Sequence, residues 1–134
     1  MTDLVFFYGT LMSGFKRPGR ERLDLALAPV GYGWIRAVLF DLGIYPAAIP
    51  ATDSRVRGEV HRMLDADAVL PALDEIEGYR PGQPDASLYV RRETSVTLDD
   101  GSTADVWVYF YNAPLGGAQR IESGDYLEYL KVKR

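Results

Sequence analysis

The stretch Asp99-Asp-Gly-Ser102, followed by Ala104-Asp-Val-Trp-Val-Tyr-Phe-Tyr111, decides the fold class of this chain. Asp100 and Gly101 suit the positive φ values that a tight hairpin turn requires. The segments that flank the turn are Leu88–Leu98 and Ala104–Tyr111. We therefore expect these two segments to form an antiparallel hairpin.

The second strand of this hairpin carries large apolar side chains on both faces. Successive side chains on a strand point to opposite faces. One face holds Val106, Val108 and Phe110, and the other holds Trp107, Tyr109 and Tyr111. We expect one face to join the core and the other to form the wall of a cavity.

Three more segments have strand character. Leu4–Tyr8 is an apolar run that ends at Gly9, a pattern typical of a strand buried on both faces. Gly31–Leu42 is a second strand, and Val56–His61 alternates as a half-buried strand does. Two prolines exclude a central strand at Tyr45–Pro50, so a loop or an edge segment is expected there.

Helices are few and short in this prediction. A helix is expected around Glu21–Leu27, after an exposed loop, and another at Tyr126–Leu130, capped by Asp125 or Ser123. The third, over the segment from Asp67 to Tyr79, has Asp67 as its candidate cap. The pattern predicts one α+β domain over residues 1–134, with a small mixed β-barrel of about five to seven strands and short flanking helices.

Composition excludes several classes of function. The chain has 134 residues, no cysteine and a net charge of −4, with a pI near 4.9. This acidic balance argues against nucleic acid or an anionic membrane as partner and favours a small, polar or zwitterionic ligand. We expect a monomer or homodimer. Without cysteine there is no thiolate catalysis, and His61 alone cannot make a poly-histidine metal site.

The start of the chain suggests no targeting segment. Met1–Tyr8 lacks a basic start, and its apolar run is too short for a signal peptide or a membrane span. The absence of cysteine is compatible with a reducing cytosol. We expect the protein to be cytoplasmic.

Glu77 is the candidate catalytic residue, because it falls on the apolar face of the predicted helix. At about 100° per residue, with Leu70 at zero, Glu77 lies at about 340° and Leu73 at about 300°. Gly78 is a natural terminator, so Glu77 lies in the last turn, where burial and the helix dipole both raise a carboxyl pKa. A raised pKa suits proton transfer near neutral pH. The alternative is a side chain that curls out to solvent.

A turn directly after the first strand is the second candidate feature. Tyr8-Gly9-Thr10-Leu11 can bring successive backbone N–H groups together to bind an anion, although strand-Gly-Thr is also ordinary turn chemistry. The cationic cluster from Lys16 to Arg22 reads as a solvated loop, or as a group that guides an acidic ligand. His61 is assigned no role. The tyrosines Tyr89, Tyr109 and Tyr111 serve as core residues or also contact a ligand.

These elements together resemble the gamma-glutamylcyclotransferase-like family, closest to its compact gamma-glutamylamine cyclotransferase branch. The resemblance covers nearly the whole chain. It rests on Tyr8-Gly-Thr-Leu11, Val56-Arg-Gly-Glu-Val60, Leu73-Asp-Glu-Ile-Glu-Gly-Tyr79 and Tyr89. Longer members carry Asn after a Gly-Ser pair, where this chain has Leu11. The resemblance implies a barrel of five or six strands, with no metal and no organic cofactor.

The resemblance also implies a reaction. A gamma-glutamyl amine or amide would cyclise, releasing 5-oxoproline and a free amine. Glu77 would be the general acid/base, and the Tyr8–Leu11 backbone would hold the glutamyl end. Leaving-group contacts would come from the poorly constrained loops at Met12–Arg22, Tyr45–Ala51 and Tyr79–Ser87, the last of which could act as a lid.

Two other classes of function stay open at this point. One is a non-catalytic small-ligand binding or regulatory domain on the same fold, which the acid at Glu77 disfavours. The other is a protein-interaction module that uses exposed aromatic residues such as Trp34 and Trp107. No motif in the sequence supports this class.

Overall fold

The computed structural model describes residues 2–15 and 17–133, so Met1, Lys16 and Arg134 lie outside the described residues. The elements, in chain order, are β1 (Leu4–Phe7), the 3₁₀ helix η1 (Arg20–Ala26), β2 (Leu27–Asp41), β3 (Pro46–Met63), α1 (Ala66–Glu77), the 3₁₀ helix η2 (Pro84–Ala86), β4 (Tyr89–Leu98), β5 (Thr103–Tyr111), β6 (Gln119–Arg120) and α2 (Tyr126–Lys133).

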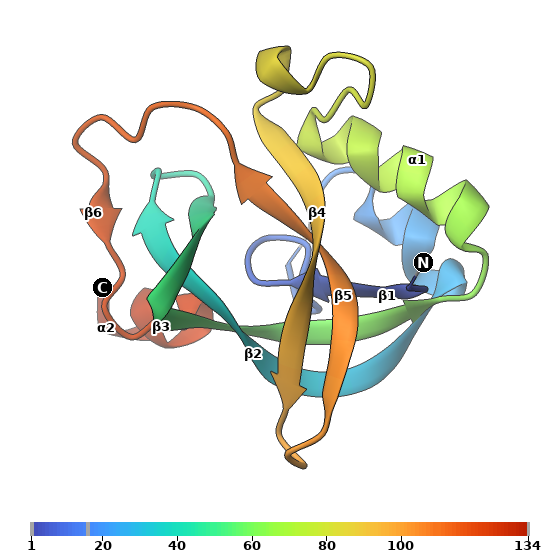
Figure 1. The fold of residues 1–134 in the computed structure, drawn as a ribbon, viewed down its shortest axis with the longest axis horizontal. Coiled ribbons are helices and arrows are strands. Elements are labelled where there is room, and N and C mark those ends of the chain that lie inside the picture. The colour runs from blue at the N-terminus through green and yellow to red at the C-terminus, as the bar shows by residue number, and fades with distance from the viewer. Residues whose placement is uncertain (1, 16, 134) are drawn as a thin grey trace.

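The strands form a mixed sheet in the order β3-β1-β5-β4-β2-β6, and the pairing of β3 with β2 closes five of them into a barrel. The parallel pair is β1 with β5, and the other pairings are antiparallel. Figure 1 shows this barrel, with α1 along one side of it next to β4 and β5. The predicted fold class is therefore confirmed.

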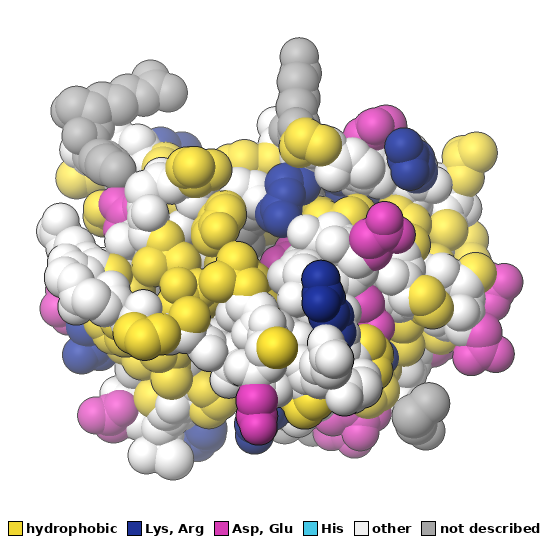
Figure 2. Space-filling model, turned by 90° about the horizontal axis from the view of Figure 1, so that it is seen from above, with side chains coloured by type: hydrophobic (Ala, Val, Ile, Leu, Met, Phe, Trp, Pro, Cys, Tyr) yellow, Lys and Arg dark blue, Asp and Glu magenta, His cyan; other side chains and the backbone are white. Residues whose placement is uncertain are grey.

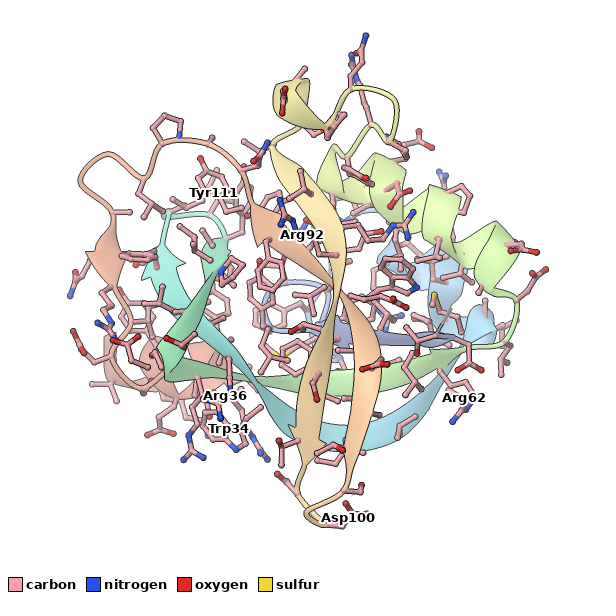
Figure 3. All side chains as sticks on the ribbon, viewed as in Figure 1. Trp34, Arg36, Arg62, Arg92, Asp100 and Tyr111 are labelled. Atoms are coloured by element: carbon pink, nitrogen blue, oxygen red, sulfur yellow. The ribbon has the colours of Figure 1, made fainter. Side chains whose placement is uncertain are left out.

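The predicted hairpin is the β4–β5 pair. Its register runs from Tyr89 opposite Tyr111 to Thr97 opposite Thr103. Gly101 has a φ of 89°, as the turn requires, and Asp100 lies at the tip of the hairpin (Figure 3). Val106 and Val108 are completely buried and Phe110 nearly so, and these three side chains belong to the core.

The segment with two prolines is an edge strand, so the alternative of a loop was wrong. Pro46 pairs with Asp41, and Pro50 pairs with Ala37, as the first part of β3. The register then shifts between Arg36 and Ala37, where the ladder is irregular. Proline cannot donate a ladder hydrogen bond, but an edge segment tolerates this loss.

The side chains of Glu59 and His61, near the end of β3, are buried. The alternating pattern of Val56–His61 predicts a half-buried strand, so the prediction was wrong at these two residues. Glu59 is 5% exposed and His61 is 3% exposed. The loop after β1 covers this face of the strand, because the backbone N–H and the hydroxyl of Ser13 both donate to Glu59 Oε1, at 2.8 and 2.9 Å. A sequence pattern cannot show which distant loop covers a strand.

Helix α1 begins slightly earlier than predicted and ends where predicted. Asp65, and not Asp67, is the N-cap residue. At the other end Gly78 adopts a left-handed conformation with a φ of 69°, and Tyr79 N–H donates to the carbonyl of Asp74 at 2.8 Å. Because the helix ends at this point, Glu77 lies in the last turn of α1. Its side chain faces the end of the barrel at which the Tyr8–Leu11 turn follows β1.

Helix α2, at the C-terminal end of the described residues, has a side-chain cap at its start. Of the two candidate caps of α2, Asp125 is the one used, since its Oδ1 accepts the N–H of Glu128 at 3.2 Å. Among the described residues, no helix combines the length and the apolar character that crossing a membrane requires. Figure 2 shows the molecule from the end where α1 and η2 lie. On this face, hydrophobic side chains gather mostly on the half that is farther from α1.

Candidate active site

Glu77 is buried, as the helical pattern predicts. Only 9% of its surface is exposed, and it lies on the buried face of α1 with Leu70 and Leu73. Glu75, on the same helix, is exposed. Burial disfavours the charged carboxylate and raises the pKa of Glu77 to about 7, against a smaller opposing effect from the positive charge of Arg17. At neutral pH both protonation states of this carboxyl are therefore populated, as a group that accepts and returns a proton requires.

Glu77 borders a small hollow, here called the Glu77 hollow, at the end of β1. Its volume is about 30 Å³. It is lined by Phe6, Phe7, Tyr8, Gly9, Thr10, Leu11, Arg17, Tyr45, Pro46, Glu77, Tyr89 and Tyr109. Since one water needs about 10–15 Å³, the hollow has room for about two or three waters.

The Tyr8–Leu11 turn forms one wall of the Glu77 hollow. The turn closes with a hydrogen bond from Met12 N–H to the Gly9 carbonyl at 3.0 Å. Gly9 is needed for space rather than for an unusual φ, because a Cβ at this position would lie 2.7 Å from Pro46 Cγ. The close approach of Pro46 thus sets the shape of the turn.

Three of the predicted tyrosines line the Glu77 hollow with hydroxyls that are already engaged. Tyr8 donates to the carbonyl of Tyr109 at 2.6 Å, Tyr89 donates to that of Pro46 at 2.9 Å, and Tyr109 donates to Asp74 Oδ1 at 2.6 Å. Burial is the main cause that raises the pKa of each of these phenols. They form walls that stay protonated.

Tyr111 is the one predicted binding residue that does not border the Glu77 hollow. Its ring packs edge-on against Tyr89, with 5.3 Å between the ring centroids, and it lies near the end of β5 (Figure 3). The structure therefore leaves Tyr111 outside the lining, in contact with Tyr89, and brings the other predicted residues together: Glu77, Tyr8, Gly9, Thr10, Leu11, Tyr89 and Tyr109.

Arg17 belongs to this site, although the sequence pattern favours a solvated loop at its position. Its Nη1 donates to Thr10 Oγ1 at 2.7 Å and lies 3.7 Å from Glu77 Oε1. Its Nη2 donates to the carbonyl of Ile76 at 3.1 Å. Arg17 thus ties the turn after β1 to the end of α1. The sequence carries no signal for this contact, because the loop brings the side chain back from outside any regular element.

Asp74 is the second residue that the sequence reading missed. It is 6% exposed and is bound by Arg91 Nε at 2.9 Å as well as by Tyr109. The available signal was weak, because the same helical wheel places Asp74 at about 40°, next to Leu70 but just beyond the apolar stripe. Asp74 attaches α1 to β4 and β5, and so it fixes the helix that carries Glu77.

Comparison with known proteins matches the architecture to one family. The family model described as gamma-glutamyl cyclotransferase, AIG2-like, matches residues 5–128. The chain is 32% identical over 124 residues to the gamma-glutamylcyclotransferase family protein ytfP of Citrobacter rodentium, covering 92% of this chain and 95% of that protein.

Solved structures show the same fold. The solution NMR structure of ytfP from Escherichia coli matches with a TM-score of 0.64 at 29% identity, over 94% of this chain and 97% of that one. The crystal structure of YkqA from Bacillus subtilis matches with a TM-score of 0.72 at 23% identity, over 99% of this chain. The chain spans only 42% of that longer protein.

Proposed function

Because the chain belongs to the gamma-glutamyl cyclotransferase, AIG2-like family, we propose that it cyclises a gamma-glutamyl amine or amide, releasing 5-oxoproline and a free amine. The observation that carries the proposal is the buried Glu77, whose pKa is raised to about 7 next to the turn after β1. The site and the family thus point to the same chemistry.

The proposed reaction needs little from the protein beyond positioning and proton transfer. The α-amine of the substrate attacks its own γ-carbonyl carbon, a five-membered ring forms, and the bond to the leaving nitrogen breaks. Holding the two groups together can contribute several kcal/mol, on the order of the gain seen in oriented intramolecular reactions. We therefore expect neither a metal nor an organic cofactor to take part.

Glu77 is the proposed general acid/base. The ionised carboxylate takes a proton from the α-ammonium group, which frees the lone pair for attack. The protonated carboxyl then returns that proton to the leaving nitrogen. The attacking nitrogen loses a second proton as the ring forms, and the released amine takes this proton up and leaves as an ammonium ion. A pKa of about 7 suits both steps, since neither form is strongly disfavoured near neutral pH.

The turn after β1 is the proposed binding site for the glutamyl end. Gly9, Thr10 and Leu11 border the Glu77 hollow, and their backbone N–H groups are the proposed donors to the α-carboxylate or to the oxygen of the attacked carbonyl. Tyr8, Tyr89 and Tyr109 supply walls, with Tyr111 supporting Tyr89. We propose that the protein acts in the cytoplasm, as a monomer or homodimer.

The test is a panel of gamma-glutamyl amides assayed for 5-oxoproline. Wild-type protein is expected to release it from at least one amide, and Glu77→Gln is expected to lose at least about 100-fold in kcat, the scale of general acid/base catalysis. Glu75→Gln is the matched control, because Glu75 is exposed on the same helix. Equal activity of Glu77→Gln and wild type would refute the role of Glu77. Inactivity of wild type on the whole panel would favour a ligand-binding domain.

A further inference from the structure

Two charged side chains line the Glu77 hollow. Among the described residues of its lining, Glu77 is the one acid and Arg17 is the one base. The guanidinium of an arginine stays positively charged in proteins, while burial raises the pKa of Glu77 to about 7. The hollow thus presents a fixed positive charge next to a carboxyl group, and only the carboxyl group has a role in the proposed reaction.

Arg17 is held in place by three segments around the Glu77 hollow. Its Nη1 donates to Thr10 Oγ1 at 2.7 Å, and its Nη2 donates to the carbonyl of Ile76 at 3.1 Å. Its guanidinium carbon lies 5.9 Å from the centre of the Tyr45 ring, within the range of a cation–π contact. The guanidinium is therefore oriented before a ligand arrives, which lowers the cost of binding.

These contacts do not use the whole guanidinium of Arg17. An arginine side chain has five N–H donors, and hydrogen bonds within the described residues use two of them. The distance from Nη1 to Glu77 Oε1 is 3.7 Å, which is longer than a hydrogen bond. Because 22% of the side chain is exposed, a ligand can reach Arg17. Arg17 can therefore donate to a ligand without giving up the contacts that hold it.

The α-carbon of a gamma-glutamyl substrate carries both an ammonium group and a carboxylate group. In the proposed reaction the α-ammonium gives its proton to Glu77, so its nitrogen must come within hydrogen-bond distance of that carboxyl. The carboxylate carbon is only two bonds of about 1.5 Å away from this nitrogen. Since Arg17 Nη1 lies 3.7 Å from Glu77 Oε1, one α-carbon can place its ammonium on Glu77 and its carboxylate on Arg17.

A carboxylate that leaves water needs a charged partner, because an unpaired ion is strongly disfavoured in a buried site. The hydroxyls of Tyr8, Tyr89 and Tyr109 already donate to acceptors of the protein. Arg17 is thus the charged donor that the described lining offers. A guanidinium can hold a carboxylate through two parallel hydrogen bonds, which are stronger than bonds between neutral groups.

We propose, resting on the cyclisation proposed above, that Arg17 binds the α-carboxylate of the substrate and selects substrates in which this carboxylate is free. A gamma-glutamyl group whose α-carboxyl is amidated is then a poor substrate. The assignment leaves the backbone N–H groups of Gly9–Leu11 for the oxygen of the attacked carbonyl. Arg17 is in this way a specificity-determining residue, whereas Glu77 moves the protons.

The test compares a substrate that has the α-carboxylate with one that lacks it. The first is the γ-methylamide of L-glutamate, and the second is the same compound with its α-carboxyl converted to a primary amide. Methylamine release is the assay for both. Arg17→Gln removes the charge and keeps a polar side chain. Arg22→Gln is the matched control, because Arg22 belongs to the same cationic cluster and is exposed but does not border the Glu77 hollow.

The expected result is a loss of preference for the carboxylate substrate. Wild type should have a kcat/KM at least about 10-fold higher for the carboxylate substrate than for the amide, the scale of a hydrogen bond to a charged group. Arg17→Gln should bring this ratio close to one, and Arg22→Gln should keep it. A change in the pKa of Glu77 acts on proton transfer in both substrates, so the ratio reports the carboxylate contact.

Two outcomes of this comparison would overturn the inference. If Arg17→Gln keeps the ratio of wild type, the α-carboxylate is bound elsewhere in the site. If Arg22→Gln lowers the ratio as much as Arg17→Gln does, the field of the cationic cluster, and not a contact with Arg17, selects the carboxylate.

A binding measurement separates this inference from the proposed reaction. L-Norvaline has the same α-ammonium and α-carboxylate groups but no γ-carbonyl, so it cannot cyclise. Titration of ¹⁵N-labelled wild type should shift the amide signals of Thr10 and Leu11, with a Kd at least about 10-fold lower for L-norvaline than for L-norvalinamide. Arg17→Gln should lose this difference.

The combined results distinguish the two proposals. A wild-type protein that prefers L-norvaline but releases no methylamine from either substrate would refute the cyclisation and keep Arg17 as a carboxylate site. Equal affinity of wild type for the two ligands, or no shift with either, would overturn the assignment of Arg17.

Discussion

The hydroxyl of Tyr109 lies 2.6 Å from Asp74 Oδ1, and Arg91 Nε lies 2.9 Å from the same oxygen. Asp74 precedes Glu77 by about one turn of α1. This buried network joins the helix that carries the candidate acid to the strands that form the wall of the Glu77 hollow. The distance between Glu77 and the turn after β1 therefore depends on Asp74.

Removing the Asp74 carboxylate is expected to destabilise the fold strongly. Asp74→Ala leaves Arg91 and the Tyr109 hydroxyl without their buried partner, at a cost of about 3–5 kcal/mol in the free energy of unfolding. Urea unfolding at pH 7 measures this loss. Asp67→Ala, at an exposed position of the same helix, should change stability by less than about 0.5 kcal/mol. A loss for Asp74→Ala no larger than for Asp67→Ala would contradict the anchoring role.

The stability of the protein should fall with rising pH because of Glu77. Its pKa is 4.5 in the unfolded reference and about 7 in the fold. Between these values the folded state binds more protons than the unfolded state, so the free energy of unfolding decreases as pH rises. Neutralising the group by Glu77→Gln should thus stabilise the protein at pH 8 by about 3 kcal/mol relative to wild type.

The same comparison at low pH provides the check on this stability prediction. At pH 4 the Glu77 carboxyl is protonated in the fold and mostly protonated in the unfolded chain, so its ionisation lowers the stability of wild type far less than at pH 8. Urea unfolding of both proteins at pH 4 and pH 8 measures the effect. A difference in stability that is the same at the two pH values would show that Glu77 does not titrate as its burial implies.

Arg17 should hold down the pKa of Glu77. Its positive charge opposes the effect of burial, so Arg17→Gln is expected to raise that pKa above about 7. If the ionised Glu77 is the base, kcat/KM of wild type should rise with pH through about pH 7, and this rise should move to higher pH in the variant. NMR titration of the ¹³C-labelled side-chain carboxyl measures the pKa directly.

Arg36→Gln is the matched control for Arg17, since it removes the same charge. Arg36 is exposed on β2, on the other side of the barrel from α1 (Figure 3). It should leave the pKa of Glu77 unchanged. An equal change in the two variants would mean that net charge, and not the contact with Arg17, sets the pKa.

A methyl group at Gly9 is expected to disturb the site. The Cβ of Gly9→Ala would lie 2.7 Å from Pro46 Cγ, and the proline ring cannot turn away as a flexible side chain does. The shift should cost about 1–3 kcal/mol of stability and lower kcat/KM for 5-oxoproline release. Thermal unfolding and the activity assay measure the two effects. Gly82→Ala, where a Cβ meets nothing within 4 Å, should show neither. Unchanged activity in Gly9→Ala would remove the turn from the site.

The sequence by itself determined the features that depend on neighbouring residues. The hairpin followed from Asp100-Gly101 between two strand segments, and the burial of Glu77 followed from its place on the apolar stripe of α1. The end of α1 at Gly78 also depended on a neighbouring residue alone, because glycine adopts the left-handed conformation at low cost. Such periodic and turn signals require no knowledge of the rest of the chain.

Only the tertiary structure decided which distant groups surround these features. Arg17 reaches Glu77 because the loop after β1 folds back against the end of α1, and Ser13 from the same loop buries Glu59 on β3. Pro46, the first residue of β3, fixes the need for glycine at position 9 although it lies far away in the sequence. The pKa of a carboxyl and the shape of a hollow depend on groups close in space, and closing the barrel brings these groups together from residues far apart in sequence.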